Sequence, residues 1–293
     1  MIHRRSISKD LQEAAAWLKA INIDFENSRF AQYANHLKRA EGGQLDQSGH
    51  DSAIEASDLY MIYRGLSRLD HPNLHQKLKI FVESGPLHSS QERPGGATGL
   101  ARNTALELLI ASQFALAGYD LDFNTTSDVA FRDGRTMFHV ECKRPFTYNG
   151  VKKNIERAYS QLRHRYRDSI GSTARGLVVL SIAKFSNPMN QTLSISDDRE
   201  LVAFMSGRFE EFLRAHQRLF YRNHDERTMA VLAYLQIAVA YQDRKGTGIH
   251  RQFAGMYLST VNPTDIKYMN PDRLYFHEIV ERINRSNKNA LRN

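Results

Sequence analysis

Residues 127–143 read SDVAFRDGRTMFHVECK, and this stretch decides the fold of the chain because it predicts a β-hairpin. The dipeptide Asp133-Gly134 favours a two-residue turn, since glycine tolerates the positive φ that such turns need. We therefore expect Arg132 to pair with Arg135. A slip of one residue would move the apolar side chains to the wrong face of the sheet, so the hydrophobic pattern itself supports this register.

The register sorts the hairpin into two faces, because side chains alternate along a strand. Asp128 is expected on the same face as His139, Glu141 and Lys143. Asp128 and Glu141 then become diagonal cross-strand neighbours, about 7–8 Å apart at the backbone, which lets two short side chains converge on one ion. The opposite face is apolar and carries Val129, Phe131, Thr136, Phe138, Val140 and Cys142. One face is thus expected to enter the core and the other to carry chemistry.

Asp128, a gap of twelve residues and then Glu141-Cys142-Lys143 form an order of residues that resembles the PD-(D/E)xK nuclease superfamily, which includes restriction endonucleases and bacterial defence nucleases. The resemblance covers residues 100–182. It implies that Asp128 and Glu141 are metal ligands and that the carbonyl of Cys142 is a further ligand. It also implies that Lys143 orients or activates the attacking water, and that the cofactor is Mg²⁺ or Mn²⁺.

The residue types suit phosphodiester hydrolysis. Carboxylate and carbonyl oxygens are the hard ligands that Mg²⁺ prefers. The ion polarises the phosphoryl oxygen and acidifies a bound water, while a nearby cation steadies the developing charge. The alternative is that Glu141 and Lys143 form an exposed charge pair on an edge strand, which would contribute almost nothing to stability.

Residues 99–118 upstream of the hairpin predict a largely apolar helix, which Gly118 ends at the expected C-terminal position. Glu107 is its only acidic residue. In the superfamily a glutamate from this helix completes the metal site, and Glu107 matches that position. The alternative is that Glu107 lies on an exposed stripe of the helix together with Asn103.

Residues 151–168 after the hairpin predict a helix with one apolar stripe and few acidic residues. The resemblance adds Gln161, although Arg165 stands where some members of the superfamily carry a tyrosine. A charged helix is more often simply solvated. Because acidic residues are nearly absent here, we instead expect a surface that follows a nucleic-acid backbone, made of Arg144, Lys152, Lys153, Arg157, Gln161 and Arg165.

The composition favours a polyanionic partner. The chain has 40 Lys and Arg against 32 Asp and Glu, a net charge of +8 and a pI near 9.5. The single cysteine, Cys142, excludes an internal disulfide and a cysteine-based zinc site. Residues 1–20 carry charges and no apolar core, and no apolar run reaches the roughly 18 residues of a membrane span. A cytoplasmic protein with no membrane partner is therefore expected.

The predicted fold class is α/β, with a restriction-endonuclease-like mixed sheet flanked by helices. The expected parts are an N-terminal helical region (1–90), a nuclease-like catalytic core (91–190) and a C-terminal α/β extension that packs on the core (191–293). Strands are predicted over residues 128–132, 136–143, 177–182, 229–241 and 253–261. Further helices are predicted over residues 11–21, 30–40, 53–69, 74–84, 199–221 and 274–286.

The predicted function is a metal-dependent nuclease that acts on nucleic acid, with DNA favoured over RNA, and restriction or anti-phage defence as an extension of the resemblance. Specificity would come from a partner subunit or from a DNA end or structure. The alternatives are a catalytically silent DNA-binding or assembly subunit and a regulatory protein that binds another phosphate ligand. The broad apolar stripe of residues 199–221 either forms a homodimer surface or covers the sheet.

Overall fold

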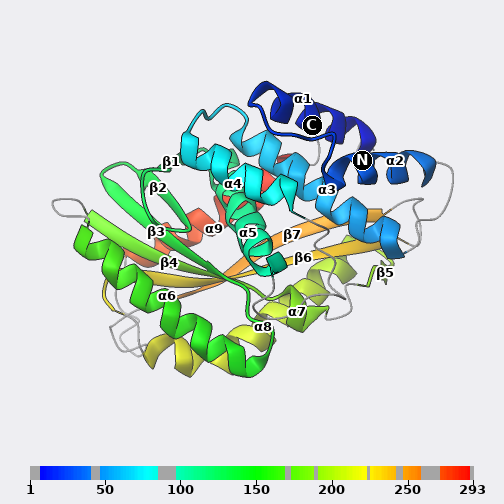
Figure 1. Cartoon of the computed structure of the whole chain (residues 1–293). Helices are drawn as coiled ribbons and strands as arrows, with labels where there is room; N and C mark the ends of the chain where they lie inside the picture. Colours follow the sequence, from blue (N-terminus) through cyan, green and yellow to red (C-terminus); the bar gives the residue numbers. More distant parts are fainter. Residues whose placement is uncertain are drawn as a thin grey trace.

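The computed structural model describes residues 7–40, 47–84, 97–168, 173–187, 191–222, 225–241, 247–258 and 271–290. Within these residues the chain is a mixed α/β protein with one seven-stranded sheet (Figure 1). The strand order is β1-β2-β3-β4-β6-β5, and β7 also pairs with β6. The strands are β1 (Asp120–Leu121), β2 (Val129–Asp133), β3 (Thr136–Lys143), β4 (Thr173–Ser181), β5 (Leu193–Ile195), β6 (Thr228–Tyr241) and β7 (Thr247–Tyr257).

Helices cover both faces of the sheet (Figure 1). Buried side chains of α1 to α5 and α9 pack on one face, and those of α6 and α8 pack on the other. The helices are α1 (Ile7–Ala20), α2 (Arg29–Ala40), α3 (Gln47–Leu66), α4 (Pro72–Glu83), α5 (Ala97–Leu116), α6 (Tyr148–Asp168), α7 (Ala183–Ser186), α8 (Asp198–Arg222) and α9 (Pro271–Ala290). The sheet thus separates two hydrophobic cores.

The hairpin turn lies one residue later than the sequence predicts. Asp133 pairs with Thr136, so Gly134 and Arg135 form the turn. Gly134 has a φ of +58° and takes the first of the two central positions, which is where a type II′ turn needs glycine. The predicted turn at Asp133-Gly134 was wrong because the glycine sets the start of the turn and not its end.

This shift moves each cross-strand partner by two residues. Ala130 pairs with His139 instead of Met137. Since side chains alternate with a period of two, a shift of two leaves every side chain on its predicted face. The apolar face is therefore confirmed: it enters the core beside α5 through Val129, Phe131, Phe138, Val140 and Cys142.

Helix α5 is held between the sheet and the N-terminal helices. Gly65 of α3 allows a close approach, because a Cβ at this position would lie 2.5 Å from the carbonyl oxygen of Ser112 on α5. Helix α4 also contacts α5. The N-terminal helices therefore place polar side chains of α4 and α5 near the open end of the hairpin.

The C-terminal part of the chain, predicted as an extension packing on the core, contributes β5, β6 and β7 to the same sheet. β7 begins at Thr247, earlier than the predicted residue 253, and pairs along most of β6. The apolar stripe of α8 covers the sheet, because Leu201, Met205, Phe209 and Phe212 are buried in the core. The proposed dimer surface retains little of this stripe, with Val202 56% exposed.

Residues 85–99 form a polar segment whose Pro86, Pro94, Gly95 and Gly96 favour a linker, and this segment lies mostly outside the described residues. None of the helices that are described is long and apolar enough to cross a lipid bilayer.

Candidate active site

Asp128 and Glu141 meet at the open end of the hairpin. Val129 pairs with Val140, so the register places Asp128 directly opposite Glu141 and not diagonally as predicted. The Oδ2 atom of Asp128 accepts a hydrogen bond of 2.7 Å from the backbone N–H of Cys142. This bond fixes the Asp128 carboxylate against the end of β3.

The ammonium of Lys143 lies among three oxygen atoms. Its Nζ is 2.8 Å from Asp128 Oδ2, 3.0 Å from Glu141 Oε2 and 3.1 Å from the carbonyl oxygen of Cys142. These are the residues that the resemblance assigns as metal ligands. The Glu141 side chain is 0% exposed and that of Lys143 is 9% exposed, so the pair is not an exposed charge pair on an edge strand. A cation is thus held at the position predicted for a metal ion.

The carboxylates crowd one another in this buried place. Burial and the neighbouring Asp128 together raise the pKa of Glu141 to about 7, against the opposing effects of Lys143 and Arg165. Burial disfavours the ammonium of Lys143, but Asp128 and Glu141 outweigh it, so the pKa of Lys143 is raised. The Oε1 atom of Glu141 is buried and accepts no hydrogen bond from the described residues. A positive charge held among these oxygen atoms therefore stabilises the buried carboxylates.

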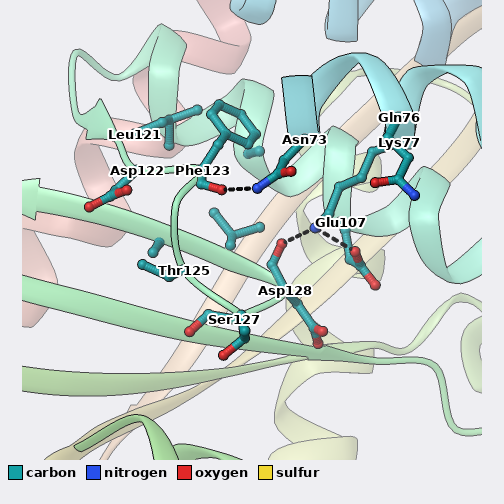
Figure 2. A pocket seen from close by; sticks show the side chains of 14 residues that line it. Asn73, Gln76, Lys77, Glu107, Leu121, Asp122, Phe123, Thr125, Ser127 and Asp128 are labelled. Atoms are coloured by element: carbon teal, nitrogen blue, oxygen red, sulfur yellow. Dashed lines mark hydrogen bonds and ion pairs between the residues drawn. The ribbon is translucent and has the colours of Figure 1, made fainter. Parts of the chain in front are cut away.

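Glu107 joins the same group of charges through a second lysine. The Nζ atom of Lys77, on α4, lies 2.8 Å from Glu107 Oε2 and 2.7 Å from the carbonyl oxygen of Asp128 (Figure 2). Burial raises the pKa of Glu107, Lys77 lowers it and Asp128 raises it. Glu107 is thus half-buried beside Asp128 and is not on an open helix surface. We call Glu107, Asp128, Glu141, Lys77 and Lys143 the carboxylate centre.

A cavity of about 370 Å³ opens beside the carboxylate centre. Figure 2 shows it between α4, α5 and the loop that precedes Asp128, with Lys77 reaching across from α4. Its size falls in the range of small-molecule sites, roughly 300–1,000 Å³. Its polar lining comes from Asn73, Gln76, Lys77, Glu107, Asp122, Thr125, Thr126, Ser127 and Asp128. A ligand in this cavity would therefore lie against two of the three carboxylates.

Arg165, predicted to contact nucleic acid, turns toward the carboxylate centre. Its Nη2 donates a 2.6 Å hydrogen bond to the carbonyl oxygen of Thr126, and its Nε lies 3.6 Å from Glu141 Oε1. It therefore braces Glu141 and the loop before Asp128. His139 is buried, and its Nδ1 lies 2.9 Å from Ser127 Oγ.

The other residues predicted to bind nucleic acid differ in how exposed they are. Lys152, Lys153 and Arg157 are exposed on α6, with Lys152 4.0 Å from Glu156. Gln161 is half-buried on the same helix. Arg144 lines a second cavity of about 170 Å³ near the end of β4 and the middle of β6. Three exposed cations therefore remain available to a phosphate backbone.

The donor set fits a hard divalent ion that keeps part of its water shell. Two carboxylates and one carbonyl surround the Lys143 ammonium, and Mg²⁺ is commonly held by one or two carboxylates with water completing its shell. Within the described part of the chain, no group of three His, Cys, Asp or Glu side chains is placed to hold a metal ion alone. Water or substrate oxygens would thus have to supply the remaining ligands.

Cys142 contributes only its backbone to this site. Its side chain is buried in the core on the apolar face, and burial raises the pKa of the thiol well above its usual value. The predicted position of Cys142 on the apolar face, which enters the core, is therefore confirmed.

Two residues of the site were missed or misplaced by sequence reasoning. Lys77 carried no local signal, because Glu107 is 30 residues away and Asp128 is 51 residues away. Arg165 did carry a signal, since it stands one helical turn after Gln161 on the side of α6 that returns to the sheet.

Comparison of the chain with protein-family models, with curated proteins and with solved structures gave no match.

Proposed function

We propose that this protein is a divalent-metal-dependent nuclease that hydrolyses phosphodiester bonds, with DNA as its main substrate and a restriction-endonuclease-like core. The observation that carries this proposal is the cation seat, meaning the Asp128, Glu141 and Cys142 oxygens around the ammonium of Lys143. Hydrolysis of a phosphodiester develops negative charge on the phosphate, and a cation held by these oxygens would stabilise that charge.

Each residue has a role in the proposal. Asp128, Glu141 and the Cys142 carbonyl would hold Mg²⁺ or Mn²⁺, and Glu107 would hold water on the same ion. When bound, the ion would polarise a phosphoryl oxygen of the substrate and make a bound water more acidic. Lys143, released from the carboxylates, would orient the attacking water and steady negative charge on the phosphate. Arg165 keeps the Glu141 carboxylate in place.

The nucleic acid is proposed to run from the carboxylate centre along α6. Lys152, Lys153 and Arg157 would contact phosphates, which positions the strand but does not read its sequence. A partner subunit, a DNA end or a DNA structure would then select the target. Restriction and anti-phage defence extend the proposal through the resemblance alone.

A second candidate is a catalytically silent DNA-binding or assembly subunit. The observation that favours it is that each of the three carboxylates already contacts a lysine: Glu107 contacts Lys77, while Asp128 and Glu141 share Lys143. In this case the ion pairs would be permanent and would bind no metal.

Cleavage assays distinguish the two candidates. The pure protein is incubated with supercoiled plasmid, linear duplex and single-stranded DNA, with and without Mg²⁺ or Mn²⁺. We expect ion-dependent cutting that falls at least about a hundredfold in Asp128→Ala, Glu141→Ala and Lys143→Ala, since each 1.4 kcal/mol or so of lost transition-state stabilisation is tenfold in rate. Glu210→Ala, which removes an exposed carboxylate from α8, serves as the matched control and should cut normally.

Equal cutting by all four variants would overturn the site. No cutting of any substrate by the folded wild-type protein would favour the silent subunit. Glu107→Gln is the finer test, because a fall of less than about tenfold would assign Glu107 a structural role only.

A further inference from the structure

We propose that Lys77 is a built-in cation that takes the place of a second metal ion, so that the carboxylate centre binds a single divalent ion. This inference rests on the proposed nuclease function. It assigns to Lys77 a positioning role, since it acts through Glu107 and Asp128.

Asp128 divides the carboxylate centre into two cation positions. Its carboxylate faces Lys143, whereas its backbone carbonyl faces Lys77 at 2.7 Å. Glu107 completes the second position with Oε2 at 2.8 Å from Lys77. The two ammonium groups therefore contact different oxygen atoms of Asp128: Lys143 contacts the side-chain carboxylate and Lys77 contacts the backbone carbonyl. In two-metal nucleases, ions at two such neighbouring positions flank the attacking and leaving oxygens.

The two positions differ in how well they attract a divalent ion. The Lys143 position offers two carboxylates and a carbonyl, whereas the Lys77 position offers one carboxylate and a carbonyl. Exchange of an ammonium for a doubly charged ion is favoured more where more negative charge converges. A divalent ion should thus displace Lys143 and leave Lys77 in place.

The fold also holds Lys77 in this position. Helix α4 packs on α5, which carries Glu107, and the side chain of Lys77 is 27% exposed along the wall of the cavity. Lys77 links α4, α5 and the start of β2 through its two contacts. It therefore fixes Glu107 and the backbone of Asp128 before any metal binds.

The test is the number of Mn²⁺ ions bound by the full chain, counted from the loss of the free-Mn²⁺ signal in electron paramagnetic resonance. We expect one ion for the wild type and two for Lys77→Met, whose second position is no longer occupied. The double variant Lys77→Met/Glu107→Gln should bind one, because the second position has lost its carboxylate. Lys79→Met, on the same helix and 65% exposed beside Glu83, is the matched control and should bind one.

Two ions bound by the wild type, or one bound by folded Lys77→Met, would overturn the role of Lys77 while leaving the nuclease proposal intact. The wild-type count decides even if Lys77→Met does not fold, because two ions there exclude a built-in cation. No Mn²⁺ bound by the wild type would overturn the proposed function itself, and this inference with it.

Discussion

This molecule contains two groups of buried charges that differ in how the charges are arranged. In the N-terminal helices, Arg29 Nε lies 2.6 Å from Glu55 Oε2, and its Nη1 donates to carbonyl oxygens at the end of α4, including those of Phe81 and Ser84. The guanidinium of Arg29 thus pairs with one carboxylate and caps the C-terminal end of α4. The carboxylate centre instead gathers three carboxylates beside a cavity.

The difference teaches that burial of charge alone does not mark a functional site. The Arg29–Glu55 pair has matched charges, and Arg29 also donates to carbonyl oxygens at the end of α4, so it holds α2, α3 and α4 together even though Glu55 lines the cavity of about 170 Å³. In the carboxylate centre, burial and repulsion from Asp128 together raise the pKa of Glu141 to about 7. Carboxylates that crowd one another beside a cavity are what indicate a place for a cation.

The largest expected effect separates the two groups by stability. Arg29→Met should lower the free energy of unfolding by about 3–5 kcal/mol, because Glu55 loses its buried partner. Urea denaturation followed by circular dichroism measures this. Arg208→Met breaks an exposed pair with Glu211 and should cost no more than about 1 kcal/mol. A loss at Arg29 as small as at Arg208 would remove the contrast.

An intermediate effect concerns the exposed cations of α6, which belong to neither buried group. Charge reversal at Lys152, Lys153 and Arg157 should weaken DNA binding equally on all sequences and flatten its salt dependence by about one log unit for each lost phosphate contact. Fluorescence anisotropy across a salt series measures the slope. The double reversal Arg214→Glu/Arg218→Glu on α8 is the control, and a slope unchanged in the α6 variant would move the DNA elsewhere.

The smallest expected effect is the change in the free energy of unfolding when a carboxylate is removed from the carboxylate centre. Glu141→Gln removes one of three crowded carboxylates, whose charge is disfavoured by burial and by Asp128. The free energy of unfolding should therefore change by no more than about 1 kcal/mol, in contrast to Arg29→Met. A loss comparable with that of Arg29→Met would mean that the carboxylate centre is also a structural ion pair.

The faces of the hairpin could be predicted because they depend only on a period of two. The turn prediction was wrong by one residue, yet Asp128 stayed on the side of Glu141 and Lys143, since the partner shift of two preserves the face. The spacing of Glu141 and Lys143 likewise fixes them on one side of β3. Local sequence thus determines most of the cation seat.

The rest of the site depends on how distant elements pack. Helical periodicity predicts α4 and α6, but it does not say that Lys77 enters the site while Lys79 stays exposed. Which polar side chain turns inward follows from the contact between α4 and α5, as for Arg165 where α6 crosses the sheet. These contacts join residues tens of positions apart and leave no local pattern.

The central claim is that the oxygens around Lys143 form a seat for a divalent ion, and Mn²⁺ affinity of Lys143→Met tests it most directly. Without its ammonium the two buried carboxylates lack a partner, which should lower stability by about 3–5 kcal/mol, and bound Mn²⁺ should restore it. Isothermal titration calorimetry should show Mn²⁺ binding at least about tenfold tighter than in the wild type, since no ammonium competes. Folded Lys143→Met that binds Mn²⁺ no more tightly than the wild type would contradict the claim.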